Sequence, residues 1–119
     1  MLLDGVSFVG HEDSYVLYLR SLGSCLVARR SALSGNRHST ALVELQSACA
    51  AFADSTLRGN AGGAAGLGLF FAQGQHARPL QLARCSFEDN RAQGAVLVTS
   101  TAEQSITVHQ CECDAAHVC

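Results

Sequence analysis

One short pattern recurs five times along this chain and limits the folds that are open to it. It consists of a small or apolar residue, an apolar residue two positions later, and usually Asn three positions after that. The central apolar residues, here called anchors, are Phe8, Leu33, Leu57, Phe87 and Cys113. Successive anchors are 25, 24, 30 and 26 positions apart. This period is typical of a solenoid, in which each unit stacks on its neighbours.

The residues around each anchor indicate strands and no substantial helix. Alternating apolar pairs lie seven and five positions before four of the anchors, and alternation with period two is the signature of a strand. These pairs are Leu26/Ala28, Ala50/Phe52, Leu80/Leu82 and Ile106/Val108. Short strand-like runs follow the Asn position at 41–45, 66–70 and 95–99. The pattern therefore predicts an all-β chain of about five coils with three short strands per coil.

The charged residues support one particular register between coils. If residues at the same repeat offset become neighbours about 4.8 Å apart, opposite charges meet in four columns. The predicted neighbours are Asp4 with Arg29, Glu12 with Arg37, Arg58 with Glu88, and Asp54 with Arg30 and Arg84. We interpret these columns as a solvated surface with weak ion pairs rather than as a ligand site.

Composition bounds the function classes. The 119 residues suit one domain, and 48% hydrophobic against 15% charged residues is typical of a chain that folds. All eight basic residues are Arg, and the net charge of -2 provides no field for phosphate backbones, so no nucleic-acid partner is expected. The longest apolar stretch, 61–72, is shorter than the roughly 20 residues that cross a bilayer, so no membrane span is predicted. Asp4 interrupts the apolar run that an export signal would need, so no signal peptide is predicted.

The stretch from Leu80 to Val96 resembles a known repeat. Within it, Phe87-Glu-Asp-Asn90 followed by Gly94-Ala95-Val96 is similar to the FxxN and GGA motifs of polymorphic outer-membrane proteins and related surface adhesins. Those repeats belong to the right-handed parallel β-helix, or pectin-lyase-like, superfamily. The resemblance implies a right-handed parallel β-helix and favours an extracellular or cell-surface location. We expect one β-helix segment over 1–119, with units 1–23, 24–47, 48–78, 79–104 and 105–119, within a longer array.

A leucine-rich repeat is the alternative architecture. Leu82-x-x-Cys85-x-Phe87-x-x-Asn90-x-Ala92 also fits the eleven-residue pattern of that class. The strand-like run at 94–99 and the later Ile106/Val108 pair count against it.

The recurring asparagines are interpreted as structural. A short amide side chain tolerates a left-handed turn, and stacked amides can hydrogen-bond along the axis. Asn36, Asn60 and Asn90 are therefore predicted to form a ladder, whereas His11 and Ala116 depart from the pattern.

Cysteine and histidine offer one candidate metal cluster: His109, Cys111, Cys113, His117 and Cys119. Their spacing matches no common zinc site, and two of the cysteines occupy core-facing repeat positions, so no metal or cofactor is expected. Disulfides between equivalent positions, Cys25 with Cys49 or Cys85 with Cys111, would span about 4.8 Å, more than the roughly 3.8 Å preferred between Cβ atoms. Buried free thiols are predicted instead.

Enzymes of the resembled superfamily cleave acidic polysaccharides, yet the Asn-Thr-Asp, Asp-Asp, Gly-His-Gly and Arg-Ile-Lys motifs of its pectin hydrolases are missing from this chain. We therefore expect a non-catalytic structural or adhesive scaffold of a surface or secreted protein that binds polysaccharide or a cell-surface protein. The alternative is a fragment of a polysaccharide lyase or glycoside hydrolase. His76 and Arg78, in the longest connection, are the candidate ligand-contacting residues. Uncapped ends predict end-to-end self-association of the isolated chain.

Overall fold

The computed structural model describes residues 1–13, 16–20, 24–38, 41–62, 69–73, 79–92, 98–100 and 106–113. Within these ranges every regular element is a β-strand, which confirms the predicted all-β class. No helix capable of spanning a membrane is found among the described residues.

The strands form four sheets, here named A to D. Sheet A contains β1 (Leu2–Asp4), β5 (Cys25–Arg29), β9 (Cys49–Ala53), β13 (Leu80–Ala83) and β17 (Ile106–His109). Sheet B contains β2 (Ser7–Val9), β6 (Ala32–Ser34), β10 (Thr56–Arg58), β14 (Ser86–Glu88) and β18 (Glu112–Cys113). Sheet C contains β3 (Glu12–Asp13), β7 (Arg37–His38), β11 (Ala61–Gly62) and β15 (Arg91–Ala92). Sheet D contains β4 (Leu17–Arg20), β8 (Val43–Gln46), β12 (Phe70–Gln73) and β16 (Val98–Ser100).

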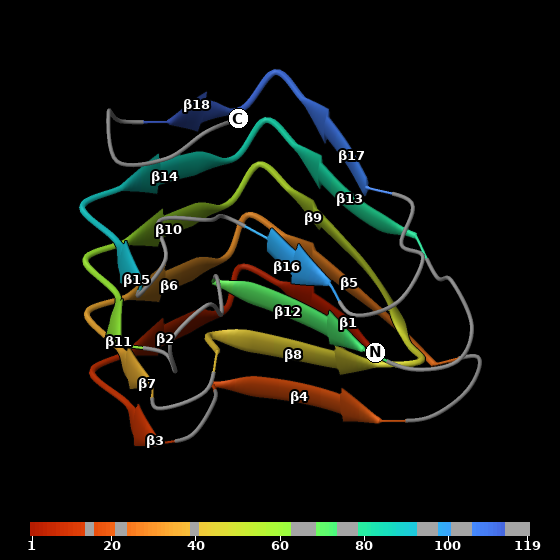
Figure 1. Ribbon diagram of the computed structural model, residues 1–119. Helices are drawn as coiled ribbons and strands as arrows, with labels where there is room; N and C mark the ends of the chain where they lie inside the picture. The colour runs from red at the N-terminus through yellow and green to blue at the C-terminus, as the bar shows by residue number, and fades with distance from the viewer. Residues whose placement is uncertain are drawn as a thin grey trace.

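Each set of four consecutive strands from β1 to β16, here called a repeat, contributes one strand to every sheet, and β17 and β18 belong to a fifth repeat in sheets A and B. The strand order within each sheet follows the order of the repeats, and all neighbouring strands of a sheet pair in parallel. Figure 1 shows the resulting stack, with β2, β6, β10, β14 and β18 lying one above the other. Residues 24 to 30 positions apart thus become neighbours, as the anchor spacing predicted.

The register between repeats agrees with the predicted columns. Phe8 pairs with Leu33, Leu33 with Leu57, Leu57 with Phe87, and Phe87 with Cys113. The anchors Leu33, Leu57 and Phe87 are each at most 1% exposed. Because alternate residues of a strand point to opposite faces, a correct register places every anchor on the inner face at once.

Aromatic rings connect three of the sheets across the core. Phe70 of sheet D lies 5.3 Å from Phe52 of sheet A and 6.5 Å from Phe87 of sheet B, measured between ring centroids. Both pairs are edge-to-face, the arrangement that aromatic quadrupoles favour. All three rings are buried, so this cluster is the centre of the hydrophobic core.

The prediction of three strands per coil is wrong by one, because a two-residue strand follows each Asn position. The strands β7, β11 and β15 belong to this group and pair in parallel in sheet C, with β11 between the other two. Two residues are too few to show alternation in the sequence, which is why the pattern did not indicate a strand there.

The asparagines themselves do not adopt the left-handed conformation that was expected of them. The residue before each Asn takes it instead: φ is 62° at Gly35, 66° at Gly59 and 53° at Asp89. Glycine has no Cβ to collide in this region and Asp tolerates it. The turn is therefore made one position earlier, and the following Asn side chain is left for hydrogen bonding.

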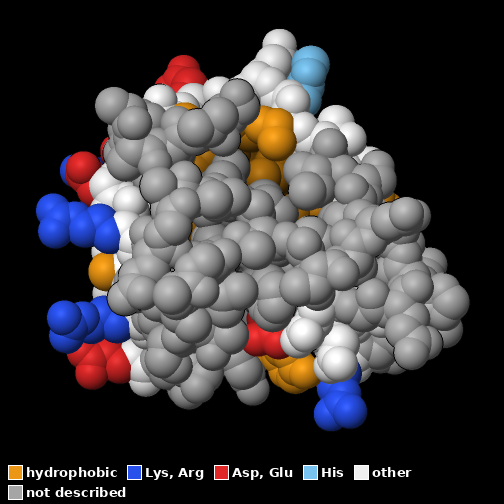
Figure 2. Space-filling model, viewed as in Figure 1, with side chains coloured by type: hydrophobic (Ala, Val, Ile, Leu, Met, Phe, Trp, Pro, Cys, Tyr) orange, Lys and Arg blue, Asp and Glu red, His pale blue; other side chains and the backbone are white. Residues whose placement is uncertain are grey.

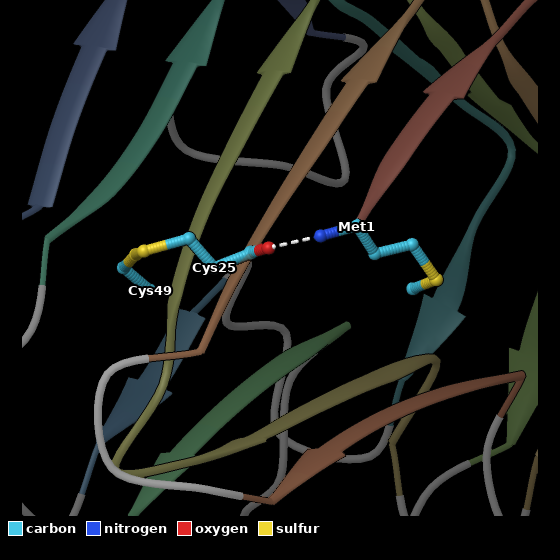
Figure 3. The surroundings of a disulfide bond; sticks show 3 residues. All are labelled: Met1, Cys25 and Cys49. Atoms are coloured by element: carbon cyan, nitrogen blue, oxygen red, sulfur yellow. Dashed lines mark hydrogen bonds between the residues drawn. A yellow bond between two sulfur atoms is a disulfide. The ribbon is translucent and has the colours of Figure 1, made fainter.

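Cys25 and Cys49 form a disulfide, which overturns the prediction of a free thiol at both positions. The two residues are direct partners at the start of β5 and β9, with their Cα atoms 4.5 Å apart, inside the range of natural disulfides. Figure 3 shows this bond beside the N-terminus, where the Met1 ammonium donates a hydrogen bond of 2.7 Å to the Cys25 carbonyl. The prediction failed because it compared the strand spacing of about 4.8 Å with the Cβ separation of a disulfide, although the relevant backbone distance, between Cα atoms, already lies in the permitted range.

Candidate functional site

The structure brings Asn36, Asn60 and Asn90 together in a buried ladder. Asn36 Nδ2 donates to Asn60 Oδ1 at 2.9 Å, and Asn60 Nδ2 donates to Asn90 Oδ1 at 2.8 Å. Each Nδ2 also donates to the carbonyl of the anchor one repeat earlier, Phe8, Leu33 or Leu57. Since their hydrogen-bonding groups are occupied inside the stack, these amides serve the scaffold rather than a ligand.

A second ladder, which the sequence analysis missed, lies two positions before the anchors. The Ser31 and Ser55 hydroxyls donate to the carbonyls of Arg29 and Ala53, at 2.9 and 2.8 Å. The Ser31 backbone N–H in turn donates to Ser55 Oγ at 3.2 Å. Cys85 and Cys111 occupy the same position in the next two repeats. The recurrence of small polar residues at one repeat offset was the available signal.

Ion pairs follow the turn between sheets A and B. Arg30 Nε donates to Asp4 Oδ1 at 2.9 Å, and Arg84 Nε donates to Asp54 Oδ1 at 2.7 Å. In both carboxyls the hydrogen bond to the Arg guanidinium holds the pKa below its usual value. All four side chains are solvent-accessible, so water and salt screen the pairs and each contributes little to stability.

These depressed carboxyl pKa values predict an acid-sensitive contribution to stability. A carboxyl whose pKa is lowered by folding stabilises the fold at pH values above its unfolded pKa, and that contribution is lost as the pH falls through the folded pKa. In an NMR titration of the carboxyl carbons, we expect Asp54 to titrate below its ordinary value of 3.8. The Arg84→Ala variant should raise the Asp54 midpoint towards that value and leave Asp4, which pairs with Arg30, unchanged. An Asp54 midpoint at or above 3.8 in the native chain would contradict the ion pair.

Opposite charges also meet along the outer edge of sheets B and C, as predicted. Arg58 Nε lies 3.6 Å from Glu88 Oε2, and Arg37 Nη1 lies 4.0 Å from Glu12 Oε1. Figure 2 shows basic and acidic side chains gathered along the edge where these strands end. All four side chains are at least half exposed, so this edge is a polar, solvated surface.

Two shallow grooves form the candidate ligand site on sheet B and the adjoining turn. One groove, of about 380 Å³, lies over β10, β14 and β18, and its polar lining includes Asp54, Thr56, Arg84, Gln110 and Glu112. A second groove of about 380 Å³ continues along β14 and β18. Ser86 and Glu112 line both, so the two grooves join into one polar surface.

The joined grooves present both hydrogen-bond donors and hydrogen-bond acceptors. Within the described part of the chain, the side chains of Thr56, Gln110 and Glu112 make no hydrogen bond or ion pair. A hydroxyl, an amide and a carboxylate therefore remain for a ligand, next to the Arg84 guanidinium. Among the described residues that line either groove, Phe87 is the one aromatic residue, and its side chain is buried. The described lining residues can bind a polar ligand by hydrogen bonds, but none of them provides an aromatic stacking platform.

A further polar cluster on sheet D was also missed. Gln73 Nε2 donates to Glu44 Oε1 at 2.6 Å, and the Tyr18 hydroxyl donates to Gln46 Oε1 at 2.8 Å. Glu44 is only 7% exposed, although the sequence placed it inside an apolar strand-like run. Its carboxylate is engaged by Gln73, so we assign the cluster to the structure rather than to a ligand.

The candidate loop residues and the candidate zinc cluster contribute no further site among the described residues. His76 and Arg78 lie outside the described residues, as do His117 and Cys119. Of the candidate zinc cluster, from which no metal site was expected, His109 is exposed, Cys111 is a free thiol and Cys113 is disulfide-bonded. Cys113 therefore has no thiolate to offer a metal. No group of three or more His, Cys, Asp or Glu side chains suited to a metal ion is found in the described ranges.

Comparison with known proteins supplies no relative: no protein-family model, curated protein or solved structure matches this chain.

Proposed function

We propose that this chain is a segment of a right-handed parallel β-helix that acts as a non-catalytic adhesive scaffold, with the joined grooves on sheet B binding carbohydrate. Parallel pairing of strands one repeat apart in all four sheets supports the β-helix. A surface or secreted protein is the proposed context, because the FxxN and GGA resemblance is to surface adhesins and the Cys25–Cys49 disulfide fits an oxidising compartment.

The free polar groups of the grooves carry the proposal for carbohydrate. Sugar hydroxyls both donate and accept hydrogen bonds, so they require acceptors and donors side by side. Glu112 supplies an acceptor, Arg84 supplies donors, and Thr56 and Gln110 supply both. One such site, in which the described residues bind by hydrogen bonds alone, binds weakly. An adhesive scaffold gains avidity by displaying several weak sites along one array.

The charges of the groove favour binding over hydrolysis. A glycosidase needs two carboxyl groups, one of them with a raised pKa so that it donates a proton to the leaving oxygen. Of the residues that the structure describes, Asp54 and Glu112 are the carboxylates that line the first groove, and the Arg84 guanidinium lowers the pKa of Asp54. Asp54 therefore stays ionised at neutral pH and is a poor general acid.

Binding to a panel of acidic and neutral polysaccharides tests the proposal. Thr56→Ala and Glu112→Ala should each weaken binding about tenfold, because each removes hydrogen bonds worth about 1 kcal/mol or more. Ser7→Ala is the matched control: Ser7 has the same strand position in the first repeat but lies outside the grooves. It should leave affinity unchanged.

Two results would contradict the proposal. Equal affinities for the native chain and both groove variants would remove the grooves as the site. Release of reducing ends or unsaturated products from any polysaccharide of the panel would replace the scaffold by the polysaccharide-cleaving alternative.

A further inference from the structure

Two free thiols occupy equivalent positions in adjacent repeats. Ser86 pairs with Glu112 and Phe87 with Cys113, so Cys85 and Cys111 are the residues directly before this registered pair. The Glu112 N–H donates to the Cys85 carbonyl at 2.9 Å, which ties the two backbones together at this point. Neighbouring strands of a sheet are about 4.7–4.9 Å apart, inside the Cα separation of 4.4–6.8 Å that disulfides span.

The two thiols also have the same orientation. Cys85 Sγ donates to the carbonyl of Ala83 at 3.4 Å, and Cys111 Sγ donates to the carbonyl of His109 at 3.6 Å, in each case two residues earlier. These contacts continue the serine ladder, in which Ser31 and Ser55 donate in the same way. Parallel side chains on adjacent strands point their sulfur atoms along the same inner column.

We propose that Cys85 and Cys111 form an inter-repeat dithiol that a low-molecular-weight disulfide, such as oxidised glutathione, converts to a disulfide bond. Cys25 and Cys49 show that this chain bridges equivalent positions of adjacent repeats. The proposal does not depend on carbohydrate binding. The new bond would hold β14 against β18 where Ser86 and Glu112 line both grooves.

The exposure of the two thiols sets the order of the steps. Cys111 is half-buried, whereas Cys85 is 2% exposed. The Cys111 thiolate attacks one sulfur of oxidised glutathione, forms a mixed disulfide and expels one glutathione thiolate. The Cys85 thiolate then attacks the Cys111 sulfur and expels the second. Two protein thiols lose two electrons and two protons, and oxidised glutathione becomes two glutathione thiols.

The second step should depend on pH. Burial raises the pKa of the Cys85 thiol, and the neighbouring Cys111 raises it further. Only the thiolate attacks, so ring closure accelerates as the pH rises towards this pKa. A thiol of ordinary pKa would reach its full rate at lower pH.

Peptide mapping provides the test, because trypsin cleaves after Arg84 and Arg91. Cys85 is then the single cysteine of peptide 85–91, and Cys111 lies in peptide 92–119. The folded chain is brought to equilibrium with millimolar oxidised glutathione at pH 8.5, denatured, and alkylated without reduction. We expect the two peptides to be joined, alkylation of Cys85 to fall at least tenfold, and dithiothreitol to reverse both changes.

Serine variants control for folding. Because serine occupies this position in two other repeats and makes the same hydrogen bond, Cys85→Ser and Cys111→Ser should both fold. The Cys111→Ser chain should keep Cys85 alkylatable after oxidation. A cross-link that persists in Cys111→Ser would show that Cys85 pairs elsewhere and would overturn the proposal. So would a native Cys85 that remains fully alkylated at equilibrium.

Discussion

Replacing Asn60 by Ala should lower the free energy of unfolding by about 4 kcal/mol. The substitution removes four side-chain hydrogen bonds inside the stack: Oδ1 accepts from the N–H and Nδ2 of Asn36, and Nδ2 donates to Leu33 and Asn90. A net hydrogen bond is worth about 1 kcal/mol, and a buried group left without a partner costs about 1–3 kcal/mol. Denaturant unfolding followed by circular dichroism measures the change.

Asn36→Ala provides the comparison for this prediction. Asn36 bonds to Phe8 and His11, which belong to the first repeat and are more exposed, so water can reach the groups that the substitution frees. Its cost should be about half that of Asn60→Ala. If both variants lose less than about 1 kcal/mol, the ladder does not stabilise the stack.

Phe70→Ala is the second large effect, expected to cost about 4 kcal/mol. Its ring is fully buried and makes edge-to-face contacts with Phe52 and Phe87, so truncation opens a cavity between three sheets. Phe70→Leu refills most of the volume and should cost less than about 1.5 kcal/mol. The same unfolding experiment measures both variants.

Val9→Ala is the control for Phe70→Ala. Val9 is 64% exposed on β2, so its truncation removes little buried area and should change stability by less than about 0.5 kcal/mol. A Phe70→Ala chain as stable as Val9→Ala would mean that the aromatic cluster is not the centre of the core.

The repeat made the register predictable. A single period of 24 to 30 residues determines which residues become neighbours, so the anchor pairs and the pairing of Asp4 with Arg29 follow from the sequence alone. Burial of one face then leaves one acceptable register, since a slip of one residue would expose every anchor.

Details that depend on local departures from the period were not predictable. The Cys25–Cys49 bond depends on the local orientation of two side chains, and the left-handed residue lies one position before the Asn. The sheet D cluster joins residues in parts of the repeat that carry no recurring sequence motif. The length of the connection between β12 and β13 also changes the number of residues between successive anchors. The grooves arise from three strands of different repeats, so no local pattern marks them.

The alternating charges at the turn between sheets A and B bear on how the chain avoids misassembly. Repeats with similar sequences can pair out of order, since any repeat offers the next one comparable strands. In the native order Asp4 lies beside Arg30, and Asp54 beside Arg84. Omitting one repeat would place Arg84 beside Arg30 and Asp54 beside Asp4, and like charges opposite each other are unfavourable. Ion pairs that add little to the stability of the finished stack therefore penalise a wrong order of assembly.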